Sequence, residues 1–245
     1  MRRAPATAVI VVLGLAACSH GSPPPPAAAP ATVMALGDSV PAGTACDCTP
    51  YPDLSAADVA HRTGLSVSAL NDAVPGATSS DVKRALDDDA GVVDHAHAAS
   101  AFEIEVGAND VAHSEACGTD AACYEAKIPA VEQNLEAIVA RVRSLNPTAK
   151  GIVLLDYWSA WLGGQYAQAQ GPAYVSAADA VTHALNAAIR AVAQRTDAHY
   201  VDLRTAFRGP DDAWDETHLL APDGEHPNAE GHQRIAEAVA ATIGT

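Results

Sequence analysis

Aromatic residues are scarce in this chain. Phe, Trp and Tyr together make up 4% of its 245 residues, although 49% of the residues are hydrophobic. The core therefore has to be built from Ala, Val, Leu and Ile, whose small side chains let helices pack closely on a sheet. We expect a layered, alanine-rich domain, and the length suits one such domain better than two.

Basic residues are few as well. The chain has 14 Lys and Arg against 30 Asp and Glu, which gives a formal net charge of −16. Phosphate backbones and anionic lipid surfaces repel a protein with this charge. The composition therefore argues against nucleic-acid binding, and it argues against a purely electrostatic attachment to membranes.

The apolar run at the amino end, Ala8 to Leu15, is too short to span a bilayer comfortably. It follows the positive segment Met1-Arg2-Arg3 and precedes small residues, which is the pattern of a signal peptide over residues 1–17. Leu15-Ala16-Ala17-Cys18 also resembles the lipobox of bacterial lipoproteins, which implies cleavage before Cys18 and lipidation of that cysteine. An ordinary signal peptide with an incidental cysteine is the alternative.

Residues 18–31 contain Pro23-Pro24-Pro25-Pro26 and have no apolar periodicity. Such a Pro/Ala-rich segment is stiff and extended, so it is expected to act as a tether for the folded domain. We therefore expect an exported protein that is anchored in the cell envelope or on the cell surface, or secreted. Membrane contact is expected through the lipid anchor alone.

Cysteine is rare, with five residues in the chain, and four of them follow the tether: Cys46, Cys48, Cys117 and Cys123. Export favours disulfides over metal ligation. Cys117 and Cys123 are spaced to close a small loop, whereas the single residue between Cys46 and Cys48 would strain a bridge. Cross-pairing between the two loops is the competing arrangement.

Apolar periodicity divides residues 32–245 into alternating strands and helices. Strands are expected at 33–36, 65–70, 101–106, 152–155 and 199–203. Helices are expected at 53–62, 79–89, 128–145, 176–195 and 227–243. This alternation predicts one α/β domain with a parallel sheet and helices on both faces. We expect the domain to be a monomer.

The first predicted strand ends abruptly in Gly37-Asp38-Ser39. Open α/β sheets bind their ligands beyond the carboxyl ends of the strands, so Ser39 is a candidate nucleophile. Position 41 is proline, whereas the Gly-x-Ser-x-Gly elbow of α/β-hydrolases requires glycine there. The sequence therefore disfavours that rival fold.

The segment from Asp223 to Pro227 offers a base for this serine. Three-residue spacing can bring the Asp223 carboxylate to the His226 ring, and Pro227 suits the first position of the last helix. An acyl-transfer serine also needs donors for the developing oxyanion. Gly76 and Asn109 follow the second and third predicted strands and are placed to supply them.

Four ordered blocks carry a family resemblance: Gly37-Asp38-Ser39, Gly76 within residues 73–78, Gly107-Ala108-Asn109-Asp110, and Asp223-Gly224-Glu225-His226. Over about residues 32–243 the chain resembles the SGNH hydrolase (GDSL esterase/lipase) family. The resemblance implies a flavodoxin-like, three-layer α/β/α sandwich with a parallel sheet of about five strands. It also implies no metal and no organic cofactor.

The same resemblance implies roles for the site residues. Ser39 would be the nucleophile, His226 the general base and acid, and Asp223 the residue that orients His226. The backbone amides of Ser39 and Gly76 and the side chain of Asn109 would form the oxyanion hole.

Several other residues are weaker candidates. Trp158 and Trp161 follow the fourth predicted strand, where they could line the substrate pocket or anchor a loop, and Trp214 could form another wall. His95 and His97 lack the neighbouring ligands of a metal site, and His113 is expected on the loop surface after Asn109.

These observations predict a secreted serine esterase or lipase that hydrolyses carboxylic esters with short or medium acyl chains. The expected partner is an ester substrate, either a lipid or an acylated glycan. One alternative is an acyltransferase or deacetylase that acts on a cell-envelope glycan. Another is a surface binding lipoprotein that keeps the fold without catalysis.

Overall fold

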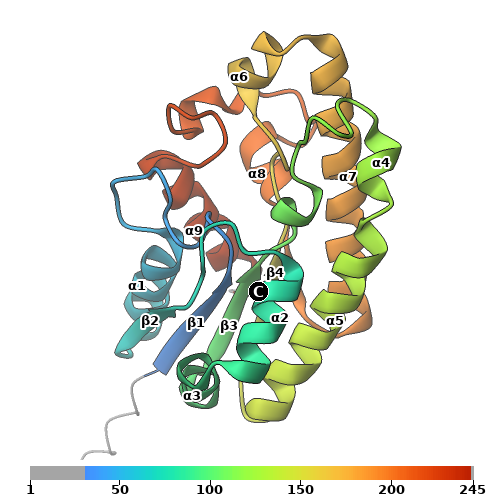
Figure 1. Ribbon diagram of the computed structural model, residues 1–245. Coiled ribbons are helices and arrows are strands. Elements are labelled where there is room, and N and C mark those ends of the chain that lie inside the picture. Colours follow the sequence, from blue (N-terminus) through green and yellow to red (C-terminus); the bar gives the residue numbers. More distant parts are fainter. Residues whose placement is uncertain (1–30, 244–245) are drawn as a thin grey trace, which may run out of the picture.

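The computed structural model describes residues 31–243, and its centre is a sheet of five parallel strands (Figure 1). The strands are β1 (Ala31–Gly37), β2 (Val67–Asn71), β3 (Ala101–Glu105), β4 (Ile152–Leu155) and β5 (His199–Val201). Their order is β2-β1-β3-β4-β5, which is the flavodoxin-like order. The predicted fold is thereby confirmed, whereas the predicted signal peptide, Cys18 and most of the tether lie outside the described residues.

Helices cover both faces of the sheet (Figure 1). One face carries α1 (Tyr51–Thr63) and α9 (Ala229–Ile243), which pack against each other, with α8 (Leu203–Arg208) beside α9. The other face carries α2 (Ser79–Asp88), α3 (Ala90–Ala98), α5 (Ile128–Leu145) and α7 (Pro172–Arg195). In α5 the buried residues Val131, Leu135, Ile138 and Val142 recur at helical spacing, as expected for a stripe that packs on the core.

The segment after α2 differs from its prediction. It was expected to be a connector beyond residue 89, but residues 90–98 form the helix α3. The Asp89 side chain explains this start, because it accepts hydrogen bonds from the backbone N–H groups of Gly91 (2.8 Å) and Val92 (3.3 Å).

Two further boundaries move because polar side chains cap helices. Asp202 accepts a hydrogen bond from the Thr205 backbone N–H, so β5 ends at Val201 and α8 follows at once. Asn228 accepts hydrogen bonds from the N–H groups of Glu230 and Gly231, so α9 begins at Ala229 and not at Pro227. His226 therefore lies in the loop, farther from the helix than predicted.

Short helices in the connections were not predicted: α4 (Ala121–Glu125), α6 (Gly164–Ala169), η1 (Ala108–Val111) and η2 (Glu216–Leu219). Among residues 31–243, no helix has the length and apolar character needed to cross a bilayer. From β1 the chain goes to β2 at one edge and then crosses to β3 on the other side of β1. The carboxyl ends of β1 and β3 thus meet at the point where the strand order reverses, which is the usual ligand site in such sheets.

Candidate active site

Gly37 brings the backbones of β1 and β3 unusually close at this point. A Cβ atom on Gly37 would lie 2.1 Å from the Glu105 carbonyl oxygen, so no other residue fits without a backbone shift. The next residue, Asp38, donates its backbone N–H to the same carbonyl at 3.2 Å. Ser39 is therefore held at the carboxyl end of β1, directly beside the end of β3.

Asp38 is buried, and its carboxylate is fixed by two donors. Oδ1 accepts the Val40 backbone N–H at 3.1 Å, and Oδ2 accepts the Tyr157 hydroxyl at 2.5 Å. Burial raises the pKa of Asp38 to about 6, although Tyr157, Val40 and the nearby His226 oppose that rise. Asp38 thus shapes the turn that carries Ser39, and it also places a carboxyl group near His226.

His226 and Asp223 form the predicted pair. The His226 Nδ1 atom lies 2.8 Å from Asp223 Oδ2, while Asp223 Oδ1 accepts the backbone N–H groups of Glu225 (3.0 Å) and His226 (3.1 Å). Partial burial acts to raise the pKa of Asp223, but these hydrogen bonds outweigh burial and lower it. An ionised Asp223 holds the proton on Nδ1 and leaves Nε2 free to act as a base.

The loop that carries this pair is anchored on both sides. Gly163 donates its N–H to the Gly224 carbonyl at 2.9 Å, and Ala221 donates its N–H to the His226 carbonyl at 2.8 Å. The described residues give the Ser39 hydroxyl no hydrogen bond to His226. Catalytic hydrogen bonds are often long in ligand-free enzymes and tighten when substrate binds, so this geometry is compatible with a serine–histidine pair.

The two candidate oxyanion donors lie in loops that contact each other. Gly76 adopts a φ of 82°, a left-handed conformation that favours glycine. Asn109 Nδ2 donates a hydrogen bond to the carbonyl of Ala77, the residue after Gly76, at 3.1 Å. Since an amide NH₂ group has two hydrogens, one of them remains for a substrate oxygen.

Asp110 locks these loops to α2. Its carboxylate accepts hydrogen bonds from the Ser79 backbone N–H at 2.8 Å and from the Ser79 hydroxyl at 2.7 Å. Asn134 on α5 donates a further hydrogen bond to that hydroxyl at 2.9 Å. The loops after β2 and β3 are therefore fixed relative to each other, as an oxyanion site requires.

Sequence reasoning missed a group of buried acids on β3. Glu103 and Glu105 are both buried on the face toward α1, where the Ser55 hydroxyl donates to Glu103. Burial raises the pKa of Glu103 to about 7, and burial together with Asp38 raises that of Glu105 well above its usual range. Two glutamates alternating within the apolar strand Ala101–Val106 were the available signal.

The three tryptophans occupy different surroundings. Trp158 is 1% exposed and stacks on Phe207 with ring centroids 4.3 Å apart, so it packs in the core. Trp161 is 3% exposed, yet it is one of the residues that line a cavity of about 420 Å³. Trp214 is 56% exposed and lines a separate, smaller cavity of about 150 Å³.

The four described cysteines pair within their own loops, as Cys46–Cys48 and Cys117–Cys123. Potential ligand atoms of Cys46, Cys48 and His232 lie within 4.8 Å of one another. However, His232 Nδ1 accepts the Tyr51 backbone N–H at 3.2 Å, so the proton of the neutral ring is on Nε2. Both sulfurs are joined in the Cys46–Cys48 disulfide, so neither is a thiolate that could bind a cation, and the chemistry of this cluster does not fit a metal.

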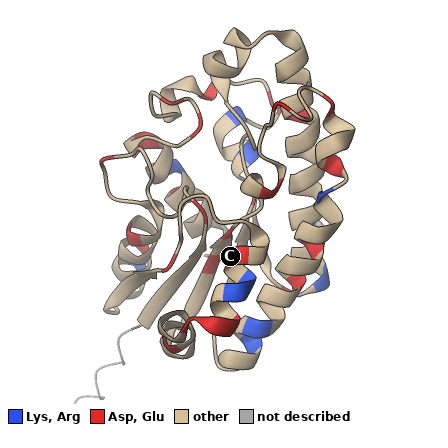
Figure 2. Ribbon diagram, viewed as in Figure 1, with Lys and Arg blue, Asp and Glu red and all other residues tan. Residues whose placement is uncertain are grey.

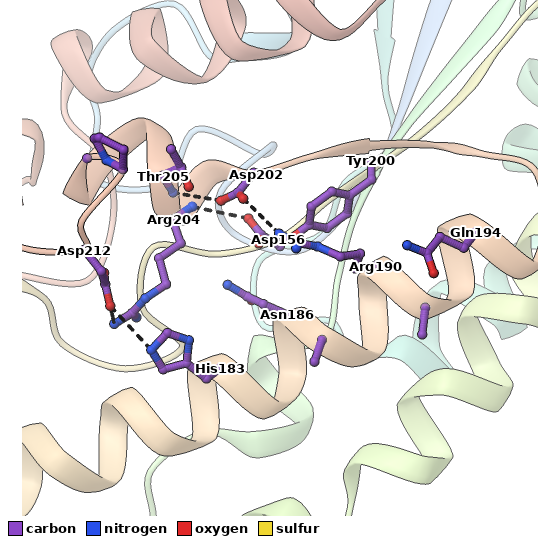
Figure 3. A pocket seen from close by; sticks show the side chains of 14 residues that line it. Asp156, His183, Asn186, Arg190, Gln194, Tyr200, Asp202, Arg204, Thr205 and Asp212 are labelled. Atoms are coloured by element: carbon purple, nitrogen blue, oxygen red, sulfur yellow. Dashed lines mark hydrogen bonds and ion pairs between the residues drawn. The ribbon is translucent and has the colours of Figure 1, made fainter.

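A cavity of about 360 Å³ lies between α7, β5 and α8, beyond the β4 side of the sheet (Figure 3). Its charged groups are already paired, since Arg204 Nη2 lies 2.7 Å from both Asp179 and Asp212. Asp156 accepts hydrogen bonds from the Tyr200 hydroxyl and the Leu203 N–H, and burial raises its pKa to about 7. This network fastens β4 and β5 to α8 and contains none of the predicted site residues.

The charge distribution limits what can approach the site. Acidic side chains are spread over the loops at the carboxyl edge of the sheet, whereas most Lys and Arg residues lie on helices (Figure 2). Negative potential around a site repels anionic ligands and favours neutral or cationic ones.

Similar structures share this architecture. The lipase Lip_vut3 from a goat rumen metagenome is 15% identical, with 86% of this chain and 97% of the lipase covered and a TM-score of 0.68. Axe2, an acetylxylan esterase from Geobacillus stearothermophilus, is 21% identical, with 88% and 94% covered and a TM-score of 0.61. A GDSL-like lipase from Parabacteroides merdae is 16% identical, with 87% and 95% covered and a TM-score of 0.67. Identities this low establish the fold alone.

None of the curated proteins matches the chain. The family match is stronger evidence, because the GDSL-like lipase/acylhydrolase family matches residues 35–234, a stretch that runs from the turn at Ser39 to beyond His226. Together with the strand order, this match shows that the chain belongs to the GDSL-like lipase/acylhydrolase family of ester hydrolases.

Proposed function

We propose that this protein is an exported serine esterase that hydrolyses carboxylic esters with short or medium acyl chains through an acyl-enzyme on Ser39. The Asp223–His226 pair carries the proposal, because its 2.8 Å contact fixes the imidazole tautomer that a serine nucleophile needs. Membership of an ester-hydrolase family supports the reaction class.

In the proposed mechanism, Ser39 Oγ attacks the ester carbonyl carbon while His226 Nε2 takes the hydroxyl proton. The oxyanion receives hydrogen bonds from the Ser39 and Gly76 backbone amides and from Asn109 Nδ2. His226 then gives its proton to the leaving alcohol. Water attacks the acyl-enzyme by the same route, which releases the carboxylic acid and restores Ser39.

Two substitutions test this function. Ser39→Ala is expected to abolish hydrolysis of aryl esters while the circular dichroism spectrum stays that of the native fold. Asn109→Ala is expected to lower kcat by about a hundredfold or more, because one preorganised oxyanion donor is lost. Full activity in purified Ser39→Ala protein would refute the mechanism.

Acyl transfer to a glycan acceptor, or deacetylation of a glycan, is the second candidate. The same acyl-enzyme reacts with water or with a hydroxyl, and one of the structural neighbours is named an acetylxylan esterase. Product analysis with an acceptor sugar present separates transfer from hydrolysis. A binding lipoprotein without catalysis is the third candidate, and it predicts no covalent reaction of Ser39.

Export and anchoring at the cell envelope are part of the proposal. They rest on the signal-like segment of residues 1–17 and on Cys18. Cys18→Ala is expected to prevent metabolic labelling with a fatty acid and to release the protein from the membrane fraction. Equal labelling of both proteins would contradict the anchor.

A further inference from the structure

We infer that the alcohol half of the ester is an uncharged sugar, bound in the 420 Å³ cavity beside Trp161. Gln170 and Glu225 would hold its hydroxyl groups. The inference rests on the proposed esterase function, because it concerns the group that leaves when the acyl-enzyme forms.

The cavity is lined by sequence neighbours of two proposed catalytic residues, His226 and Asn109. Glu225, which lines the cavity, directly precedes His226. Ala112 and His113, which also line it, follow Asn109 at the end of the short helix η1. A ligand in the cavity therefore lies between the loop of the proposed base and the loop of a proposed oxyanion donor, and its volume is that of a small-molecule site.

Aromatic rings form the floor of the cavity. The His113 ring centroid lies 4.9 Å from that of Trp161 and 5.2 Å from that of Tyr174. Trp161 Nε1 donates to the Val111 carbonyl at 2.7 Å, and the Tyr174 hydroxyl accepts the Leu162 N–H at 3.2 Å. These hydrogen bonds hold the buried Trp161 and Tyr174 rings in place, and the exposed His113 ring that packs against them offers the flat surface on which the C–H face of a sugar packs.

Three exposed side chains that line the cavity carry polar atoms: His113, whose ring also forms part of the floor, Gln170 and Glu225. Within residues 31–243, no hydrogen bond engages the His113 ring nitrogens, the Gln170 amide or the Glu225 carboxylate. Together they offer donors and acceptors at several points around one rigid apolar surface. This combination matches a pyranose, which has both an apolar face and a rim of hydroxyl groups.

Other alcohols fit less well. No Lys or Arg lines the cavity, so an alcohol that bears phosphate or carboxylate lacks a counter-charge and meets Glu225. A fatty alcohol would bury Gln170 and Glu225 without hydrogen-bond partners. A quaternary ammonium alcohol is held best between several open aromatic faces, but Trp161 and Tyr174 are almost wholly covered, which leaves the His113 ring as the one exposed ring among the residues that line the cavity.

The test compares esters that share one acyl group and differ in the alcohol: p-nitrophenyl acetate, acetylcholine and O-acetylated pyranosides of glucose, xylose and N-acetylglucosamine. The wild-type protein is expected to have a higher kcat/KM for at least one sugar acetate than for acetylcholine. The double variant Gln170→Ala/Glu225→Gln is expected to lower the ratio of kcat/KM for sugar acetate to kcat/KM for aryl acetate by about tenfold or more, because hydroxyl contacts are lost.

The matched controls are two exposed residues of the same types that do not line this cavity. Gln168→Ala on α6 and Glu230→Gln on α9 remove the same exposed groups and are expected to keep the wild-type ratio. A preference for acetylcholine, hydrolysis of aryl acetate without any sugar acetate, or an unchanged ratio in the double variant would overturn the inference and leave the esterase function standing. A wild-type protein that hydrolyses none of these esters would instead contradict the proposed function.

Discussion

Two aspartates lie near His226, and their surroundings give them different properties. Asp223 is partly exposed and bound by the imidazole and two backbone amides, which lower its pKa. Asp38 is buried, and burial raises its pKa to about 6 despite the Tyr157 hydrogen bond. Asp223 is therefore ionised throughout the neutral pH range, whereas Asp38 gains or loses its charge near pH 6. Asp38 also lies near His226, which becomes positively charged during the proposed reaction.

Tyr157→Phe tests the contribution of Asp38. Losing the hydroxyl removes a hydrogen bond that lowers the Asp38 pKa, so less of Asp38 is ionised at pH 7 and the protonated His226 of the transition state is less stabilised. We expect kcat/KM to fall severalfold at pH 7 relative to wild type and to recover as the pH rises to 9. The measurement is the variant-to-wild-type ratio of kcat/KM across this range.

Asp38→Asn is the control, because its side chain carries no charge at any pH. Its ratio to wild type is expected to show no such recovery between pH 7 and pH 9. The titratable groups that interact with Asp38 include Tyr157, His226, Asp110, Glu105 and Tyr51. If Tyr157→Phe also showed a constant ratio, the charge of Asp38 would have no part in the reaction.

At the scale of elements, the sequence predicted the five strands and the long helices because their apolar periodicity is strong. The stripe of α5 and the continuous apolar run of β4 are examples. Asp223 and His226 could be predicted as a pair because their contact is local in the chain. The sequence predicted that Asn109 lies near the Gly76 loop because both follow strands whose carboxyl ends share one edge of the sheet. The structure adds the hydrogen bond from Asn109 to the carbonyl of Ala77.

Other features depend on contacts between distant residues and could not be predicted from local pattern. Tyr157 and Asp38 are 119 positions apart, and only the sheet order brings them together. The short helix α3 was missed because its start depends on one side chain, Asp89. The start of α9 was misplaced because Pro227 resembles a first helical residue, whereas Asn228 makes the capping hydrogen bonds.

Asn228→Ala tests that helix start. Asn228 caps α9 through Oδ1, and its Nδ2 donates to the carbonyls of His218 and Leu220. Loss of a cap costs about 1–2 kcal/mol, which corresponds to a decrease in Tm of roughly 2–8 °C for a domain of this size. Asn228→Asp keeps the capping oxygen and is expected to lose less. Equal Tm values for Asn228→Ala and wild type would show that Pro227 fixes the helix start.

At the scale of the whole molecule, burial of acids dominates the pH dependence of stability. Glu103 and Asp156 have pKa values of about 7 in the folded protein because they are buried, and that of Glu105 is raised as well. Between their ordinary values, near 4, and pH 7, the folded protein holds protons that the unfolded chain has released. The contribution of these protonated carboxyl groups to the stability of the folded protein is therefore complete at low pH, and it is lost as the pH rises through 7.

His232 acts in the opposite direction, but at lower pH. Burial lowers the pKa of His232 to about 4. Below about pH 6.5 the imidazole is therefore protonated in the unfolded chain but stays neutral in the folded protein, which lowers the stability of the folded protein. The stabilisation at low pH comes from several carboxyl groups, whereas the destabilisation at low pH comes from His232 alone. We therefore expect Tm to be higher at pH 5.5 than at pH 8 by several degrees. Thermal unfolding followed by circular dichroism measures this difference.

Glu103→Gln is the matched variant for this effect. Glutamine can still accept the Ser55 hydrogen bond but does not titrate, so the decrease in Tm between pH 5.5 and pH 8 should become smaller. A wild-type Tm that rises toward pH 8, or an unchanged decrease in Glu103→Gln, would contradict the assignment of protonated carboxyl groups to the core.

The most direct test of the account is covalent labelling with a fluorophosphonate, followed by mass spectrometry of the intact protein and its peptides. We expect one adduct per chain, located on Ser39, and a labelling rate at least about a hundredfold lower in His226→Ala, because the serine then lacks its base. An unlabelled Ser39, or a labelling rate that does not depend on His226, would contradict the proposed catalytic site.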